Sequence, residues 1–315
     1  MNKLMKRILS ITTTVIASVV LVSSIIFFTM PSVVIDLANY AERVAAGLEL
    51  VEVQVNKHNW VYLDGGSGET IVFLHGFGMD KDSWGTLLKD FSTSYRIIAP
   101  DLPGFGESTR LMSENYNIPI QVQRLKTFLN TVGVSSFHLV GFSMGGGIAG
   151  YYASENPSQV KSLMLIGALG AASEESDYNR LLEETGENIF LTKNVEQFDK
   201  LMTYGFYQTP SSIPEPIKTF LVDKATADYN FFEKVGKELD QEIHILDKRL
   251  PKIHAKTLII WGANDRMIHV SSAKIFEKGI NDSHTVIIDK AGHMVYFEFP
   301  EKVSKTYRIF LKNLP

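Results

Sequence analysis

Residues 137–152 read FHLVGFSMGGGIAGYY, and this stretch decides the fold. The apolar run over 137–142 predicts a buried strand, and a glycine-rich helical pattern follows directly after Ser143. The serine has a glycine at both second neighbours, Gly141 and Gly145. This G-x-S-x-G pattern has a steric cause: a serine on a sharp strand-to-helix turn adopts strained backbone angles, and side chains at the two flanking positions would collide with the strand and the helix. The stretch therefore predicts a serine nucleophile on such a turn.

The composition excludes several classes of protein. The chain has 315 residues, of which 45% are hydrophobic and 21% charged, so it can form one large α/β domain with an insertion, which we favour, or two smaller domains. Its net charge of -4 leaves no basic surface for nucleic acid. The absence of cysteine excludes disulfides, thiolate metal sites and a cysteine nucleophile. No metal or cofactor is expected, and the Gly145–Gly147 run is not a phosphate loop because no Lys-Ser/Thr pair follows it.

A long uncharged segment lies near the N-terminus. Residues 8–30 form a stretch of 23 apolar or small polar residues, which as a helix would be about 34 Å long and would cross a hydrocarbon core of about 30 Å. A cleaved signal peptide has a shorter apolar region of about 7 to 15 residues and ends at a small-x-small site, whereas FFTMP follows here at 27–31. The segment therefore favours an uncleaved membrane anchor, with a secreted protein as the alternative.

Basic residues flank this segment unequally. Lys3, Lys6 and Arg7 precede it, whereas acidic residues outnumber Arg43 in the flank that follows. The positive-inside rule then predicts a single-pass protein with a cytoplasmic N-terminus and its catalytic domain on the far side of the membrane, periplasmic or extracellular.

A short amphipathic helix is predicted just after the anchor. Its apolar residues recur at spacings of three and four, at Val34, Leu37, Ala41, Val44 and Leu48. Such a helix either lies on the membrane surface or packs against the body of the domain.

Short apolar strands alternate with helical patterns over most of the remaining chain. Residues 48–55 and 59–63 alternate like a half-buried antiparallel pair. Buried strands of the kind found in parallel sheets follow at 70–74, 95–99, 137–142, 162–166, 257–260 and 285–288, with a helix near 118–131. This rhythm predicts a mostly parallel sheet built from right-handed crossovers.

The rhythm fails for about ninety residues between 166 and 257, which is too long for a simple crossover. Helical patterns rich in aromatic residues fill this interval and predict a helical cap, since its flanks lack the composition of a linker to a separate domain. The predicted organisation is an anchor or signal sequence at 1–30, a juxtamembrane segment at 31–48, a core at 49–166 and 257–315, and a cap at 167–256.

An activated serine needs a general base, a group that orients the base, and amide donors for the oxyanion. Asp265 and His293 each follow a predicted strand, as Ser143 does, so all three are expected at the same edge of the sheet. The N–H of Met144 lies at a helix N-terminus just after the serine, and the N–H of Phe77 lies in the HGFG loop. These two amides are the candidates for the oxyanion hole.

Five motifs occur in the order and position that a known family has them. They are HGFGMDKDSW (75–84), APDLPGFGES (99–108), GFSMGGG (141–147), WGANDRMI (261–268) and AGHMVYFEFP (291–300). From about residue 50 to its end the chain resembles the α/β-hydrolases, and among them the bacterial single-domain lipases and the monoacylglycerol lipases with an N-terminal membrane anchor. The resemblance implies an α/β-hydrolase fold with a mostly parallel eight-stranded sheet, helices on both faces and a helical cap.

The resemblance also implies a role for each candidate residue: Ser143 as nucleophile, His293 as base, Asp265 as its orienting group, and Phe77 and Met144 as amide donors. The implied activity is that of a serine hydrolase that cleaves carboxylic esters, of acylglycerols or related lipids, through an acyl-enzyme. The expected partners are a small ester or lipid substrate and, through the N-terminal span, a membrane. A carbon–carbon bond hydrolase, a haloperoxidase-like esterase and a catalytically silent binding module are the alternatives.

Three further polar residues near these motifs are expected to be structural. His75 would form hydrogen bonds beneath the oxyanion loop, Asp101 would fix the loop in which it lies, and Glu298 would cap or orient the helix after His293.

Overall fold

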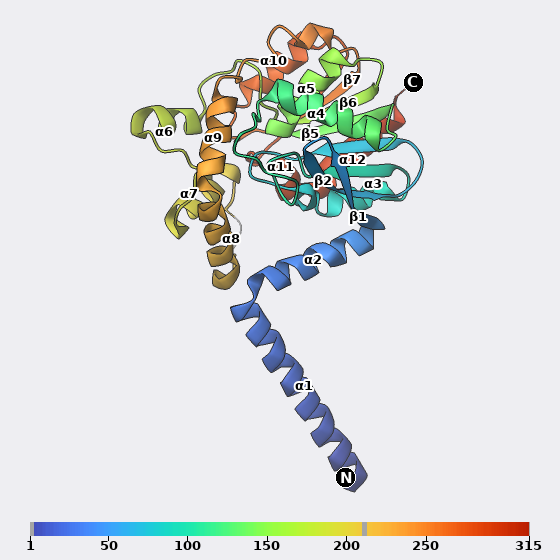
Figure 1. Cartoon of the computed structure of the whole chain (residues 1–315), viewed down its shortest axis with the longest axis vertical. Helices are drawn as coiled ribbons and strands as arrows, with labels where there is room; N and C mark the ends of the chain where they lie inside the picture. Colours follow the sequence, from blue (N-terminus) through green and yellow to red (C-terminus); the bar gives the residue numbers. More distant parts are fainter. Residues whose placement is uncertain (1–2, 210–212, 315) are drawn as a thin grey trace.

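An eight-stranded sheet runs through the centre of the fold (Figure 1). The computed structural model describes residues 3–209 and 213–314. The strand order is β1-β2-β4-β3-β5-β6-β7-β8; β2 runs antiparallel to β1 and β4, and the neighbours from β4 to β8 pair in parallel. The strands are β1 Leu48–Val55, β2 His58–Gly65, β3 Thr70–Leu74, β4 Arg96–Pro100, β5 Phe137–Phe142, β6 Val160–Ile166, β7 Lys256–Gly262 and β8 Ser283–Ile288. The predicted sheet is confirmed, and each predicted strand agrees with an observed one to within two residues at either end.

Helices cover both faces of the sheet, as predicted. Alternate residues of β3 illustrate why, because Val72 and Leu74 pack into one hydrophobic core while Ile71 and Phe73 pack into the other. The first core is covered by α4 Ile118–Thr131, α5 Met144–Glu155 and α10 Ser271–Gly279. The second is covered by α3 Thr86–Ser92 and α12 Pro300–Lys312. Three short helices complete this part, η1 Lys81–Trp84, η2 Leu250–Lys252 and α11 Val295–Glu298.

Four helices lie between β6 and β7, in the interval predicted to hold the cap. They are α6 Asp177–Thr185, α7 Val195–Gly205, α8 Glu215–Ala227 and α9 Tyr229–Asp240, and Figure 1 shows them along one side of the sheet and its flanking helices. Helix α9 joins them to the sheet, since it buries Phe231, Val235 and Leu239 in the same core as α5. Residues 210–212 of the predicted cap lie outside the described residues. The division of the chain into core and cap stays a prediction.

The N-terminal helix α1, Lys3–Thr29, extends away from the rest of the molecule (Figure 1). Its segment Ile11–Thr29 is long and apolar enough to cross a membrane, with a mean hydropathy of 2.3, and none of it is buried. A signal sequence meets the same criteria, so the anchor and its orientation stay predictions. Residues 1–2 lie outside the described part of the chain.

Helix α2, Pro31–Ala46, follows directly and packs by one side against α3, α8 and β1. The helix ends earlier than predicted because Gly47 takes a left-handed conformation with φ of 63° and caps it. Leu48 belonged to both the predicted helix and the predicted strand at 48–55; it is the first residue of β1, as the strand prediction had it, and is buried there. The opposite side of α2 leaves Leu37, Tyr40 and Val44 exposed.

Candidate active site

Ser143 lies on a strained turn between β5 and α5. Its φ of 53° and ψ of -119° are unusual for a residue other than glycine. The two flanking glycines are required by close contacts: a Cβ on Gly141 would lie 2.3 Å from the carbonyl oxygen of Gly145, and a Cβ on Gly145 would lie 2.1 Å from that of Leu74. The strained turn thus follows from residues 141–145 packing tightly against strand β3.

Asp265 and His293 meet across the ends of two neighbouring strands, β7 and β8. Their side chains are buried, and His293 Nδ1 lies 2.8 Å from Asp265 Oδ2. The other carboxylate oxygen, Oδ1, accepts hydrogen bonds from the backbone N–H groups of Met267 and Ile268, at 2.9 and 3.0 Å. The carboxylate is therefore fixed in place, and it favours the imidazole tautomer with a proton on Nδ1 and a free lone pair on Nε2.

The imidazole of His293 is also held by packing. The ring of Phe142, the residue before the serine, lies against it with centroids 4.8 Å apart. On another side lies Gly167, where a Cβ would come within 3.2 Å of the imidazole. Contacts from the ends of β5 and β6 thus restrict the ring to an orientation that the Asp265 hydrogen bond also favours.

The loop that carries His293 is tied to the end of α7. Glu298, the last residue of α11, accepts hydrogen bonds from the N–H of Gly292 at 2.6 Å and from the N–H of Tyr207 at 2.8 Å. The N–H of Met294 donates to the carbonyl of Gly205 at 2.8 Å. Glu298 therefore has a structural role, but it holds the loop before α11 against the segment after α7; its capping or orienting of the helix after His293 stays a prediction.

The two candidate amides come from two segments next to the serine: Met144 follows it directly, and Phe77 belongs to the HGFG loop after β3. Within the part of the chain that the structure describes, neither the N–H of Phe77 nor that of Met144 donates to a protein acceptor. The HGFG loop approaches the serine closely, because a Cβ on Gly76 would lie 3.3 Å from the Cβ of Ser143. Both amides thus have the hydrogen-bonding capacity that an oxyanion hole needs.

His75 supports this loop from below. Its Nδ1 lies 2.8 Å from the carbonyl oxygen of Gly76 and its Nε2 lies 3.0 Å from the N–H of Leu102, which fits one neutral tautomer that donates at Nδ1 and accepts at Nε2. Complete burial lowers the pKa of His75 to about 4. The structural role predicted for His75 agrees with these contacts.

A buried lysine and its carboxylates fix the neighbouring loops. Asp101 Oδ1 accepts from the N–H of Lys81 at 2.6 Å, and Oδ2 accepts from the N–H of Glu107 at 2.8 Å and from Lys81 Nζ at 3.1 Å. Lys81 also forms ion pairs with Glu107 and Asp82. Burial alone would lower the pKa of Lys81, but the surrounding carboxylates outweigh burial and raise it. Asp101 thus fixes its loop, as expected, through a permanently charged partner.

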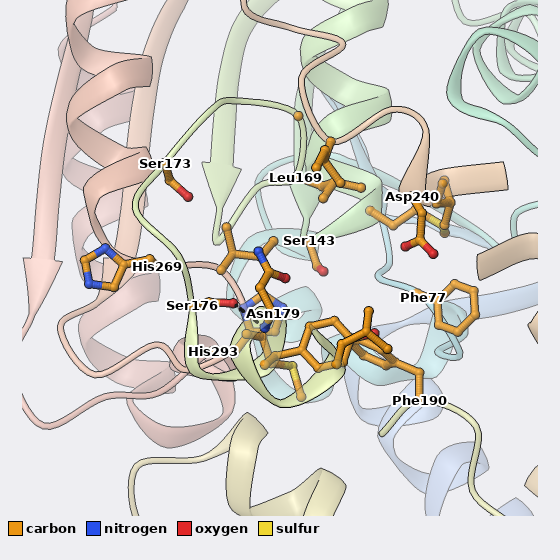
Figure 2. Close-up of a pocket in the computed structure, with 18 of the residues that line it drawn as sticks. Phe77, Ser143, Leu169, Ser173, Ser176, Asn179, Phe190, Asp240, His269 and His293 are labelled. Atoms are coloured by element: carbon orange, nitrogen blue, oxygen red, sulfur yellow. Dashed lines mark hydrogen bonds between the residues drawn. The ribbon is translucent and has the colours of Figure 1, made fainter. Parts of the chain in front are cut away.

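Ser143 and His293 open onto a common cavity of about 560 Å³, within the usual range of small-molecule sites (Figure 2). Phe77 and Met144 also line it. The remaining apolar lining comes from the loops after β6 and β7, the cap helices and their loops: Leu169, Leu182, Phe190, Leu239, Ile243, Met267 and Ile268. Four of the five predicted site residues, Phe77, Ser143, Met144 and His293, therefore line one space. The fifth, Asp265, is buried and is linked to this space through its hydrogen bond to His293, and the catalytic roles of all five stay predictions.

The sequence did not identify the polar residues of this cavity. Tyr178, Asn179, Asn188 and Asp240 line it, and all four belong to the interval between β6 and β7. No motif marks them, because their position depends on how α6 and α9 pack over the sheet. Among the described residues, no group of three or more His, Asp or Glu side chains is arranged to hold a metal ion.

Residues 69–300 match the family described as having the alpha/beta hydrolase fold. The match covers most of the chain, and the protein belongs to this family. Its relatives make it an enzyme of the lipase and esterase type.

Two curated relatives and one solved structure illustrate the similarity. Monoacylglycerol lipase abhd6-A of Xenopus laevis is 30% identical over 91% of this chain and 89% of its own length. Lipase 1 of Psychrobacter immobilis is 28% identical over 85% of this chain and 86% of its own. The crystal structure of a membrane phospholipase A, described as a bacterial virulence factor, superposes with a TM-score of 0.87 at 35% identity and covers 98% of this chain and 99% of that one.

Proposed function

We propose that this protein is a serine hydrolase that cleaves carboxylic esters of lipids through an acyl-enzyme intermediate on Ser143. The observation that carries the proposal is that a serine on a strained turn and a histidine hydrogen-bonded to the buried Asp265 open onto one cavity. This combination matches the general requirement of a nucleophile, a base and an orienting group.

Each residue has a defined part in the proposed reaction. Asp265 holds the Nδ1 proton of His293, so Nε2 can accept the proton of the Ser143 hydroxyl as its oxygen attacks the ester carbonyl carbon. The tetrahedral oxyanion accepts hydrogen bonds from the N–H groups of Phe77 and Met144. When the carbonyl re-forms, the bond to the alcohol breaks and His293 donates its proton to the departing oxygen. A water molecule then repeats the sequence on the acyl-enzyme, releasing the acid and the free serine.

Acylglycerols are the substrates that we propose. The apolar lining beside Ser143, which includes Leu169, Phe190 and Leu239, is suited to an acyl chain. The names of the relatives support this choice, since monoacylglycerol lipases and a lipase are among them. The alternative is that the same residues hydrolyse carbon–carbon bonds. This alternative would be favoured if a survey of substrates showed that esters are hydrolysed poorly.

We further propose that α1 anchors the enzyme in a membrane, with the N-terminus in the cytoplasm and the rest of the chain on the far side. The apolar length of Ile11–Thr29 and the absence of any buried residue in this segment support the anchor. The similarity to a membrane phospholipase A extends over 98% of this chain, which is consistent with a shared N-terminal helix. The basic residues before the span support the orientation.

A fluorophosphonate probe tests the nucleophile. The full chain should be labelled, and Ser143→Ala should lose both labelling and ester hydrolysis by several orders of magnitude because it cannot form the acyl-enzyme. Ser173→Ala is the matched control, since Ser173 lines the same cavity but lies outside the proposed triad. Undiminished labelling of Ser143→Ala would refute the assignment. A survey of p-nitrophenyl esters and monoacylglycerols of increasing chain length then tests the substrate class.

A further inference from the structure

The charged groups that line the cavity beside Ser143 are carboxylates, together with histidines. Three carboxylates line it, those of Glu175, Glu183 and Asp240, and among its described lining residues there is no Lys or Arg. Glu175 pairs with Arg180 at 3.3 Å. His244 and His269 also line the cavity, and each lies beside a carboxylate outside it, Asp247 at 3.5 Å and Glu174 at 4.0 Å. Among the described residues, Glu183 and Asp240 pair with no cation, so the lining carries unneutralised negative charge near the bond that the enzyme would cleave, which has consequences for the head groups it can accept.

Asp240 is the most informative of the three. It is the last residue of α9, and its side chain points into the same space as Ser143 and Leu169 (Figure 2). Among the described residues it forms no ion pair and its carboxylate accepts no hydrogen bond from the protein. The residue is exposed at the cavity wall, and desolvation of its carboxylate raises its pKa with no neighbouring cation to offset that effect. Its carboxylate is therefore available to a ligand.

The lysines of the same helix are engaged elsewhere. Lys234 pairs with Glu238 at 2.5 Å and Lys237 pairs with Glu233 at 3.4 Å. The negative charge of Asp240 instead acts on Tyr178, whose pKa is raised by burial and, secondarily, by Asp240. A hydroxyl donor and a carboxylate acceptor thus lie within electrostatic reach of each other at the cavity wall, together with the amides of Asn179 and Asn188.

We propose that Asp240 is a specificity-determining residue that makes the enzyme select uncharged, hydroxyl-bearing head groups and reject anionic ones. This inference rests on the proposed function. A glycerol hydroxyl can donate a hydrogen bond to the Asp240 carboxylate, and the amides of Asn179 and Asn188 can serve a second hydroxyl. A phosphate in the same place would lie beside the Asp240 carboxylate, with no Lys or Arg among the described lining residues to neutralise it, which opposes binding.

The distinction separates the activities named among the relatives. A monoacylglycerol lipase acts on a neutral glycerol ester, whereas a phospholipase A acts on a lipid that carries a phosphate. The charge at position 240 and the absence of Lys and Arg from the described lining favour the first kind of substrate for this chain.

The test compares two substrates that differ only in the phosphate. The full chain is assayed in mixed micelles of a non-ionic detergent with 1-oleoylglycerol and with 1-oleoylglycerol 3-phosphate, and fatty acid release gives kcat/KM for each. Rates are normalised to hydrolysis of p-nitrophenyl butyrate, which has no glycerol head group. The wild type should prefer the neutral substrate at least tenfold, equivalent to about 1.4 kcal/mol.

Variants of α9 locate the cause. Asp240→Asn should lower the ratio of kcat/KM for 1-oleoylglycerol to that for 1-oleoylglycerol 3-phosphate at least threefold. It should do so mainly by raising KM for 1-oleoylglycerol and lowering KM for 1-oleoylglycerol 3-phosphate. Asp240→Glu should restore the preference because it keeps the charge. Glu233→Gln removes the same charge from the same helix outside the cavity and should leave the preference at the wild-type value. Higher salt should narrow the preference of the wild type more than that of Asp240→Asn.

The outcomes separate the two proposals. An enzyme that hydrolyses p-nitrophenyl butyrate but acts on the two glycerol lipids at equal rates would overturn this inference alone. So would an Asp240→Asn variant that prefers 1-oleoylglycerol over its phosphate as strongly as the wild type does. A wild type that hydrolyses none of these esters would overturn the proposed function and this inference with it.

Discussion

Arg43 of α2 forms a two-point ion pair with Asp82, with Nε–Oδ1 at 2.7 Å and Nη2–Oδ2 at 2.5 Å. Both side chains are largely buried, and the hydrogen bond to Asp82 raises the pKa of Arg43. Lys81 lies 3.4 Å from the same carboxylate and 3.1 Å from Asp101. A continuous set of charges therefore connects the helix next to the predicted membrane anchor with the segment that follows Phe77.

Arg43→Met should destabilise the enzyme and slow it. It leaves Asp82 buried without its bidentate partner, at a cost of about 2 to 4 kcal/mol, and it loosens the segment that carries one oxyanion donor. Denaturant unfolding measures the first effect, and kcat on p-nitrophenyl butyrate measures the second. The control is Lys237→Met, which breaks an exposed pair and should change stability by less than about 1 kcal/mol. Equal stability of Arg43→Met and the wild type would mean that α2 is only loosely attached.

Asp265→Asn should lower kcat by about 10³ to 10⁴ with little loss of stability. The asparagine oxygen can still accept from the N–H groups of Met267 and Ile268, but its amide would donate to Nδ1 of His293 and place the imidazole proton on the wrong nitrogen. Steady-state kinetics and thermal unfolding provide the two measurements, with Asp289→Asn as a control on an exposed acid after the same strand as His293. A loss below tenfold would indicate that a different carboxylate orients the histidine.

Gly141 and Gly145, which flank the strained turn at Ser143, should tolerate no side chain. In Gly145→Ala the new methyl group would lie 2.1 Å from the carbonyl oxygen of Leu74 and 2.4 Å from that of His75, and neither backbone atom can move without displacing β3 or the HGFG loop. We expect a loss of folded, active protein. Gly236→Ala is the matched comparison, since the nearest atom to its Cβ is 3.9 Å away and alanine favours the helix by up to about 1 kcal/mol. Thermal unfolding of the two variants distinguishes a local steric cause from a general intolerance of mutation.

Sequence reasoning reached the sheet and the site because both depend on local patterns. Each parallel strand is a mainly apolar run, and Ser143, Asp265 and His293 each follow one such run. Because the carboxyl ends of parallel strands share one edge of the sheet, the sequence alone predicts that the three residues lie close together. The capping role of Gly47 has no apolar pattern to mark it, so the predicted helix extended one residue into the predicted strand and Leu48 was assigned to both.

The cavity lining was out of reach for a different reason. Asp240 and Tyr178 are sixty-two residues apart in sequence and belong to helices joined by long connections. Neither helix has a sequence motif that marks a binding residue. An amphipathic pattern predicts which residues of a helix are buried, but it does not predict which other residues they contact. The apolar pattern of α2 shows the same limit, since Leu37 and Val44 fit the predicted apolar face and yet lie exposed.

Acid should destabilise the protein through His75. Its pKa falls from about 6.5 in the unfolded chain to about 4 in the folded protein, so the unfolded state binds more protons between these values. The contribution of neutral His75 to the free energy of unfolding is fully present above about pH 6.5. It decreases by about 3 kcal/mol as the pH falls from there toward 4. Unfolding free energies across this range should show the loss, and His75→Gln, although less stable at neutral pH, should show a correspondingly flatter dependence. An equally steep dependence in the variant would assign the effect to other groups.

The last prediction concerns the separate contributions of α1 and α2. A chain that begins at Pro31 keeps the Arg43–Asp82 pair and the whole cavity but lacks the apolar span. It should hydrolyse p-nitrophenyl butyrate at the rate of the full chain, yet lose much of its rate on monoacylglycerol embedded in vesicles, because tethering raises the local substrate concentration without changing any contact at Ser143. A chain that begins at Leu48 also loses α2 and should be slower on both substrates.

Equal rates of the full chain and the Pro31 chain on vesicles would show that α1 does not deliver the enzyme to its substrate. Recovery of the natural protein in the soluble fraction with a new N-terminus beyond Met30 would identify the segment as a cleaved signal sequence.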